Sequence, residues 1–145
     1  MSWVQIWIHI VFTTKNRKPY LRTSEVRKQV FTHIKANAKE KGIWLDCTNG
    51  YKEHVHCLIS LGKDQSLSKT MQLIKGESSY WINSQKLTDQ TFRWQDDYWA
   101  ASVSKSHIDS VRNYIFNQEH HHKNIPFGEE VDEFMKKQGW RFLEG

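Results

Sequence analysis

The chain has 145 residues, of which 38% are hydrophobic, with seven Trp, seven Phe and five Tyr. This length predicts one domain over residues 1–145, and the aromatic content is sufficient for a buried core. No stretch approaches the roughly 18–20 uncharged apolar residues of a membrane span, so we expect no membrane-spanning segment. The apolar N-terminus lacks a basic leader and a small-residue cleavage site, and the chain has two cysteines. We therefore expect a cytoplasmic protein rather than a secreted disulfide scaffold.

The net charge of +5 is concentrated in the first third of the chain, where residues 1–50 contain nine Lys and Arg against three Asp and Glu. A basic end on an otherwise neutral domain is consistent with a polyanionic partner. Ordinary surface lysines give the same pattern, so charge alone does not decide between these interpretations.

The first predicted element is a strand over residues 3–14, because hydrophobic residues recur there with a period of two. Its apolar face consists of Val4, Ile6, Ile8, Ile10 and Phe12. A basic loop, residues 15–19, follows this strand. From Ser24 the apolar spacing changes to four, which predicts a helix that ends before Gly42. The apolar positions of this helix are Val26, Val30, Ile34 and Ala38.

Two further strands are predicted over residues 43–48 and 54–61, joined by Asn49-Gly50, which is a strong hairpin-turn signal. A second helix is predicted over 66–85, a fourth strand over 93–104, a third helix over 106–121 and a short amphipathic helix over 129–138. The predicted core positions of the second helix are Leu67, Met71, Ile74, Tyr80 and Trp81.

The order β-α-β-β-α-β followed by helices is the ferredoxin-like (RRM-like) pattern of an α+β protein. It predicts an antiparallel sheet with helices on one face, plus a C-terminal helix. This fold hosts many functions, so the function has to be argued from particular residues.

Two histidines lie two positions apart in the third predicted strand. Since successive strand residues point to opposite faces, His54 and His56 project from the same face. Two adjacent imidazoles form half of a metal site, and Mg2+ or Mn2+ would need added oxygen ligands. The alternative is two histidines on a half-exposed strand with no ligand.

The third predicted helix carries a tyrosine and a glutamine one turn apart. Tyr114 and Gln118 share a helix face because they are four residues apart. Gln118 offers an amide oxygen to a hard ion, and the Tyr114 hydroxyl can attack phosphorus beside a cation that stabilises the phenolate. The alternative is that Tyr114 packs on the sheet while Gln118 is solvated.

Together, His54-Val55-His56 on a strand and Tyr114-x-x-x-Gln118 on a late helix resemble the HUH-type single-tyrosine transposases of insertion sequences that move as single-stranded DNA. The resemblance covers nearly the whole chain. Residues 9–17 resemble the first strand and basic loop of the family, residues 73–76 its second helix, and residues 94–98 and 102–104 the strand before its catalytic helix.

The resemblance implies a metal-dependent reaction on DNA. His54, His56 and Gln118 would bind Mg2+ or Mn2+, and Tyr114 would be the catalytic nucleophile. Cleavage of single-stranded DNA would leave a 5′-phosphotyrosine link and a free 3′-hydroxyl, and a second strand would then be joined without ATP. The resemblance also implies a homodimer, and in some family members the tyrosine helix of one subunit completes the site of the other.

The resemblance further implies recognition of DNA hairpins near the ends of the mobile element. Phosphate contacts are expected from basic residues near the first strand, and exposed aromatic side chains could stack unpaired bases. The candidate basic residues are Lys15, Arg17, Lys18 and Arg22.

Other histidines and cysteines that could bind a metal ion are interpreted as structural residues. For His120-His121-His122, which follows Gln118 closely, a solvated helix end is the favoured interpretation. Cys47 and Cys57 lack C-x-x-C spacing, so small buried hydrophobes are expected rather than ligands of a structural zinc. The pattern assigns no role to His9.

The sequence therefore predicts a tyrosine DNA endonuclease and strand transferase, that is, a transposase. Two alternatives stay open: a non-catalytic module that binds single-stranded nucleic acid on the same fold, and a hairpin nuclease adopted by the host. A binding module has no need of a nucleophile and three metal ligands together, which favours an enzyme.

Overall fold

The computed structural model describes residues 1–122 and 125–130. The body of the domain follows the predicted order, with β1 (Trp7–Thr13), α1 (Ser24–Glu40), β2 (Trp44–Gly50), β3 (His54–Ser60), α2 (Leu67–Ser84) and β4 (Trp99–Val103). Two helices follow it, α3 (Ile108–Phe116) and α4 (Gln118–His122). Short 3-10 turns, η1 (Lys15–Arg17) and η2 (Lys105–His107), lie before α1 and α3. The predicted α+β class is confirmed.

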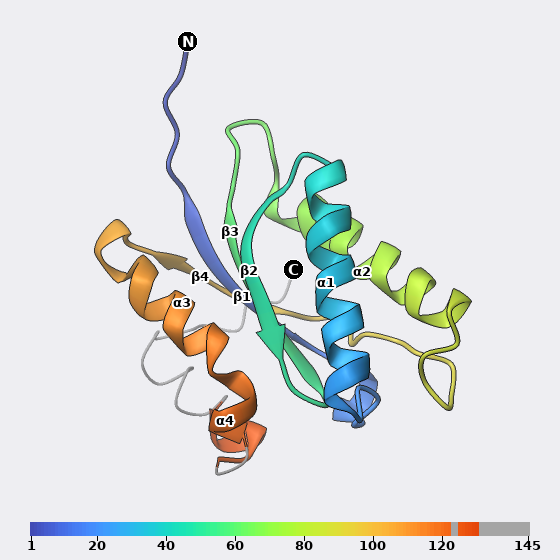
Figure 1. Cartoon of the computed structure of the whole chain (residues 1–145). Helices are drawn as coiled ribbons and strands as arrows, with labels where there is room; N and C mark the ends of the chain where they lie inside the picture. The colour runs from blue at the N-terminus through green and yellow to red at the C-terminus, as the bar shows by residue number, and fades with distance from the viewer. Residues whose placement is uncertain (123–124, 131–145) are drawn as a thin grey trace.

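The four strands form one antiparallel sheet in the order β2-β3-β1-β4. In the central pair, Ile10 lies opposite Cys57 and Phe12 lies opposite Val55. These apolar side chains are fully buried on the face that α1 and α2 cover (Figure 1). The predicted helix-covered face of the sheet is therefore the main core.

The two long helices begin where the sequence provides capping side chains. The Thr23 hydroxyl accepts a hydrogen bond from the backbone of Val26, and Ser66 accepts one from Lys69. Just beyond α1, Gly42 adopts a φ of +72°, a left-handed conformation that favours glycine after a helix. Local chemistry therefore determines these helix ends.

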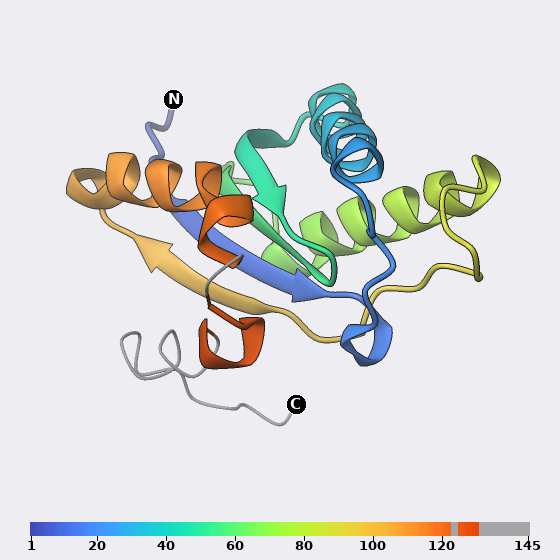
Figure 2. The same cartoon turned by 60° about the horizontal axis from the view of Figure 1, so that its bottom comes forward.

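The opposite face of the sheet carries a second, smaller group of helices. Ile108 and Ile115 of α3 pack against Leu58 of β3. Further along this face, Phe127 packs against Val11, which places the segment 125–130 below the sheet in Figure 2. The side chains of His9, His54 and His56 also belong to this face, so the C-terminal helices cover the histidines.

Two local predictions about the strands are wrong. Val4 and Ile6 are 42% and 44% exposed, because the strand starts only at Trp7. Asn49-Gly50 is not the hairpin turn, since both residues pair with β3 and the chain turns over residues 51–53. Glycine is needed there for close approach, because a Cβ on Gly50 would lie 2.1 Å from the carbonyl oxygen of His54.

Two helix predictions also differ from the structure. Tyr80 of α2 is 75% exposed instead of buried in the core. The third predicted helix is divided at Asn117 into α3 and α4. The predicted closing helix, 129–138, lies mostly outside the described residues. Within the described residues, no helix combines the length and apolar character required to cross a membrane.

Replacing Phe12 with alanine should lower the free energy of unfolding by about 3–5 kcal/mol, because a fully buried aromatic ring would leave a cavity. The matched control is Ile6→Ala, which should change it by less than about 0.5 kcal/mol, because Ile6 is exposed and precedes the strand. Urea unfolding monitored by tryptophan fluorescence measures both. If the two variants lost the same free energy of unfolding, β1 would extend further toward the N-terminus than Trp7.

Candidate metal and tyrosine site

The two histidines of β3 are fully buried, and a partner holds one nitrogen of each ring. Nδ1 of His54 lies 2.7 Å from a carboxylate oxygen of Glu53, and Nδ1 of His56 lies 2.9 Å from Nε2 of His9. Such contacts fix the orientation of an imidazole and leave Nε2 to bind a ligand. The structure therefore keeps both predicted ligands on one face, with both rings oriented.

Two further side chains complete a group that we call the His/Glu cluster, consisting of His54, His56, His122 and Glu130. One candidate ligand atom from each residue lies within 4.8 Å of those of the other three. Glu130 is 3% exposed, and its Oε1 lies 3.0 Å from Nε2 of His56. His122 contacts the other Glu130 oxygen through Nε2, while its Nδ1 lies 2.9 Å from the carbonyl oxygen of Ile125.

The interpretation of His120-His121-His122 as a solvated helix end is wrong for His122, whose side chain is only 2% exposed. The reason lies in the break at Asn117, after which α4 takes a new course and places His122 against the ring of His54, with centroids 4.6 Å apart. His120 is exposed, as predicted.

Gln118 is fully buried beside the cluster. Its amide nitrogen donates to the carbonyl oxygen of Tyr114, and its amide oxygen lies 3.0 Å from Nε2 of His54. Because the helix backbone accepts from the amide nitrogen, the oxygen is the atom directed to the histidine. Gln118 and Tyr114 thus stay together even though the helix breaks between them.

Tyr114 is half-buried on α3 and lies against the same histidines. Its ring is edge-on to His56, with centroids 5.5 Å apart, and to His9, with centroids 6.1 Å apart. Its hydroxyl donates to Oε1 of Glu130. The structure thus brings the predicted nucleophile and the three predicted metal ligands together within one chain.

Polar contacts with β2 hold α3 in this position. Asn49 donates to the carbonyl oxygens of Ile115 and Phe116 at 3.0 and 3.1 Å, and so satisfies groups that the end of a helix leaves unpaired. Arg112 makes a bidentate ion pair with Asp46 at 2.8 and 2.9 Å. The tyrosine helix is therefore fixed to a strand of its own chain.

Burial and hydrogen bonding give the site a defined charge state. Burial lowers the pKa of His56 to about 4, against the opposing effect of its hydrogen bond to Glu130, and lowers the pKa of His9 to about 3. Burial acts to raise the pKa of Glu130, but hydrogen bonds with His122 and His56 outweigh it and hold that pKa below its usual range. At neutral pH the imidazole of His56 is uncharged and Glu130 is ionised, the forms that bind metal ions.

Arg17, one of the four candidate DNA-binding residues, contacts an aromatic ring beside this site. Its guanidinium lies 5.3 Å from the ring centroid of Phe127, which in turn stacks on His54 with centroids 4.1 Å apart. The backbone of Arg17 has a φ of +53°, which is uncommon for a residue with a side chain. Lys15 and Lys18 flank it in and after η1, whereas Arg22 pairs with Asp89 at 2.9 Å on the exposed surface.

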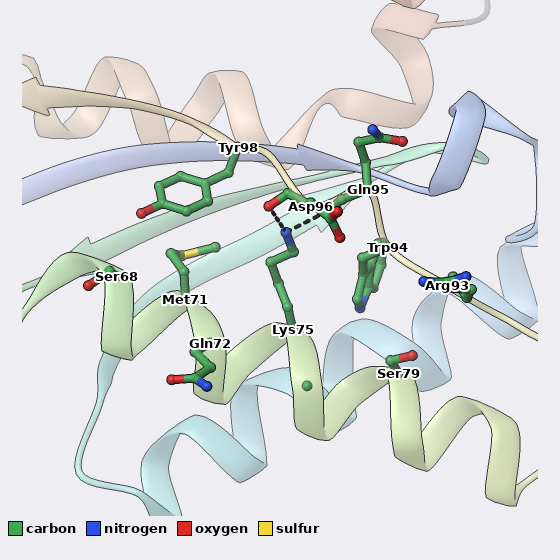
Figure 3. A pocket seen from close by; sticks show the side chains of 11 residues that line it. Ser68, Met71, Gln72, Lys75, Ser79, Arg93, Trp94, Gln95, Asp96 and Tyr98 are labelled. Atoms are coloured by element: carbon green, nitrogen blue, oxygen red, sulfur yellow. Dashed lines mark hydrogen bonds between the residues drawn. The ribbon is translucent and has the colours of Figure 1, made fainter. Parts of the chain in front are cut away.

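A separate cavity of about 400 Å³ lies between α2 and residues 93–98 (Figure 3). Lys75 crosses it and donates to the carbonyl oxygens of Gln95 and Asp96 at 2.5 and 2.8 Å. Burial lowers the pKa of this lysine. These bonds give Lys75 a structural role, which is to attach the chain before β4 to α2.

Comparison with known proteins assigns the chain to a family. A family model described as "Transposase IS200 like" matches residues 2–118. The chain belongs to this family. Its fold is similar to that of a candidate transposase from Deinococcus radiodurans R1, with 20% identity, coverage of 81% of this chain and 93% of that chain, and a TM-score of 0.65. It is also similar to a REP-associated tyrosine transposase bound to a REP hairpin, with 16% identity, coverage of 81% and 67%, and a TM-score of 0.55. No curated protein matches the sequence.

Membership of the IS200-like transposase family confirms the resemblance that the histidine and tyrosine motifs predict. Sequence reasoning missed His9 and Glu130 as parts of this transposase's site, and it set His122 aside. The spacing of four between Gln118 and His122 was a usable signal. No sequence signal of this kind identified Glu130, because its position depends on the course of the chain after α4.

Proposed function

We propose that this IS200-like transposase cleaves and rejoins single-stranded DNA, with Tyr114 as the nucleophile. The observation that carries the proposal is the convergence of the Tyr114 hydroxyl, two strand histidines and the Gln118 oxygen on one buried site. The tyrosine oxygen forms a bond to the scissile phosphorus, and the bond from phosphorus to the 3′ oxygen breaks. The phenolic proton leaves along the hydrogen bond to Glu130, and the departing strand gains a 3′-hydroxyl.

His54, His56 and Gln118 are the proposed metal ligands, and Glu130 and His122 face the same position. A set of neutral imidazoles with an amide and a carboxylate oxygen fits a divalent ion. Because nitrogen donors are numerous, the set suits Mn2+ better than Mg2+, which prefers oxygen ligands and water. When bound, the ion would neutralise charge on the phosphate and stabilise the phenolate.

Hairpin DNA is the proposed substrate. One solved relative in fold is bound to a REP hairpin, which supports this class of ligand. We propose that Arg17 contacts the phosphate next to the cleaved bond, which is supported by the position of its guanidinium over the Phe127 ring that stacks on His54. Lys15, Lys18 and Arg22 would extend this contact along the DNA backbone. A homodimer in the cytoplasm is the proposed working form.

Labelled single-stranded oligonucleotides with and without hairpins, incubated with the protein and Mn2+, test this function. Denaturing gels should show a covalent protein–DNA band on hairpin substrates, absent with chelator and formed at lower concentrations of Mn2+ than of Mg2+. Binding of hairpins without cleavage or adduct, across the panel and both metals, would support the non-catalytic binding module instead.

A further inference from the structure

A buried arginine connects α1 to α4. Arg27 is 6% exposed, whereas the other buried residues of α1 are apolar. Its Nε and Nη2 atoms lie 3.0 and 2.9 Å from a carboxylate oxygen of Glu119, and its Nη1 donates to the carbonyl oxygen of Leu21 at 2.8 Å. Since an unpaired buried charge is costly, the arginine strongly favours the position of α4 that keeps Glu119 in contact.

The hairpin turn between β2 and β3 adds a second contact in the same place. The guanidinium of Arg27 lies 4.9 Å from the ring centroid of Tyr51, and this ring stacks on His122 with centroids 5.8 Å apart and an angle of 21° between planes. We call Arg27, Tyr51 and Glu119 the Arg27 cluster. Arg27 contacts α4 near its start through Glu119, and Tyr51 contacts its last residue, His122.

The helix that they contact depends on such support. At five residues, α4 is too short to be stable as an isolated helix. The break at Asn117 also separates it from α3. Its two ends nevertheless carry Gln118 and His122, which must both face His54. Contacts outside the site therefore add to those with His54 and Glu130 in determining where these two side chains lie.

We propose that Arg27 is a positioning residue of the site, which acts through Glu119 and Tyr51 to hold Gln118 and His122 in place for the metal ion. The proposal rests on the proposed function for the metal ion, and goes beyond it by assigning a role to a residue of α1 that does not touch the site. An error of about 1 Å in the placement of such groups is enough to reduce activity strongly.

Charge-changing variants separate positioning from simple electrostatics. Arg27→Met keeps the length of the side chain and removes a positive charge, and Glu119→Ala removes a negative charge from a side chain that is 45% exposed. Electrostatics alone would tighten Mn2+ binding in the first variant and weaken it in the second. Positioning predicts at least a tenfold loss of Mn2+ affinity in both, measured by titration calorimetry.

Matched controls test the two contacts. Tyr51→Leu should weaken Mn2+ binding, whereas Tyr51→Phe should not, because it keeps the stacked ring. Lys28→Met should also bind Mn2+ as wild type does, because it removes the same charge from the neighbouring position of α1, where the side chain is exposed. Tighter or unchanged Mn2+ binding in Arg27→Met, with weaker binding only in Glu119→Ala, would overturn the proposal. If Arg27→Met fails to fold, the pair Tyr51→Leu and Tyr51→Phe provides the test.

Amide hydrogen exchange in the metal-free protein gives an independent measurement. Residues 118–122 should exchange at least tenfold faster in Arg27→Met than in Lys28→Met. Unchanged exchange there would overturn the positioning role. If wild type binds no Mn2+, the proposed metal function fails, but the exchange experiment still decides whether the Arg27 cluster holds α4.

Discussion

Replacing Tyr114 with phenylalanine should abolish the covalent protein–DNA adduct and lower cleavage at least about a thousandfold, because the phenolic oxygen is the proposed nucleophile. The fold should persist, since the ring that packs against His56 and His9 is retained. The lost hydrogen bond to Glu130 should cost only about 0.5–1.5 kcal/mol of unfolding free energy. Denaturing gels of labelled hairpin DNA, together with urea unfolding, measure both effects.

Tyr80→Phe is the matched control, because it removes the same hydroxyl from an exposed position on α2. The Tyr80→Phe variant should form the covalent protein–DNA adduct at the wild-type rate. Cleavage that persists in Tyr114→Phe would show that a water molecule, and not this tyrosine, attacks the phosphate.

A mixture of two inactive variants tests whether the site forms within one chain. The contacts of Asn49 and Arg112 hold α3 on its own β2, so a mixture of Tyr114→Phe and His56→Ala should remain inactive after the subunits exchange. Recovery of adduct formation would show that the tyrosine of one subunit works with the metal ligands of another.

Replacing Glu130 with glutamine should lower Mn2+ affinity at least tenfold, the second large effect expected. The change keeps the size of the side chain but removes the buried negative charge beside His56 and His122. A metal ion in this site would lose its one carboxylate contact among the described residues of the His/Glu cluster. Titration calorimetry with Mn2+ measures the change.

Glu129→Gln is the control for this experiment, because the neighbouring side chain is exposed and carries the same charge. Its Mn2+ affinity should match that of wild type. An equally small effect in Glu130→Gln would show that His54, His56 and Gln118 suffice, which is the ligand set that the sequence predicts.

The sequence by itself determined those features that depend on residues close together in the chain. Period-two and helical spacing predicted the order of strands and helices, and the caps at Thr23 and Ser66 agree with the predicted helix starts. Alternation along a strand placed His54 and His56 on one face without knowledge of the fold. Tyr114 and Gln118 remain close together despite the break at Asn117, because a local hydrogen bond connects the two residues.

Features that depend on residues far apart in the chain were decided only by the tertiary structure. The contact of His9 with His56 depends on the register between β1 and β3. The places of His122 and Glu130 depend on the course of the chain after Asn117. Glycine is needed at position 50 because the backbone of His54, in β3, lies close to it. The physical reason is the same in each case: packing against distant parts of the chain determines which side chains meet, and sequence patterns report only on near neighbours.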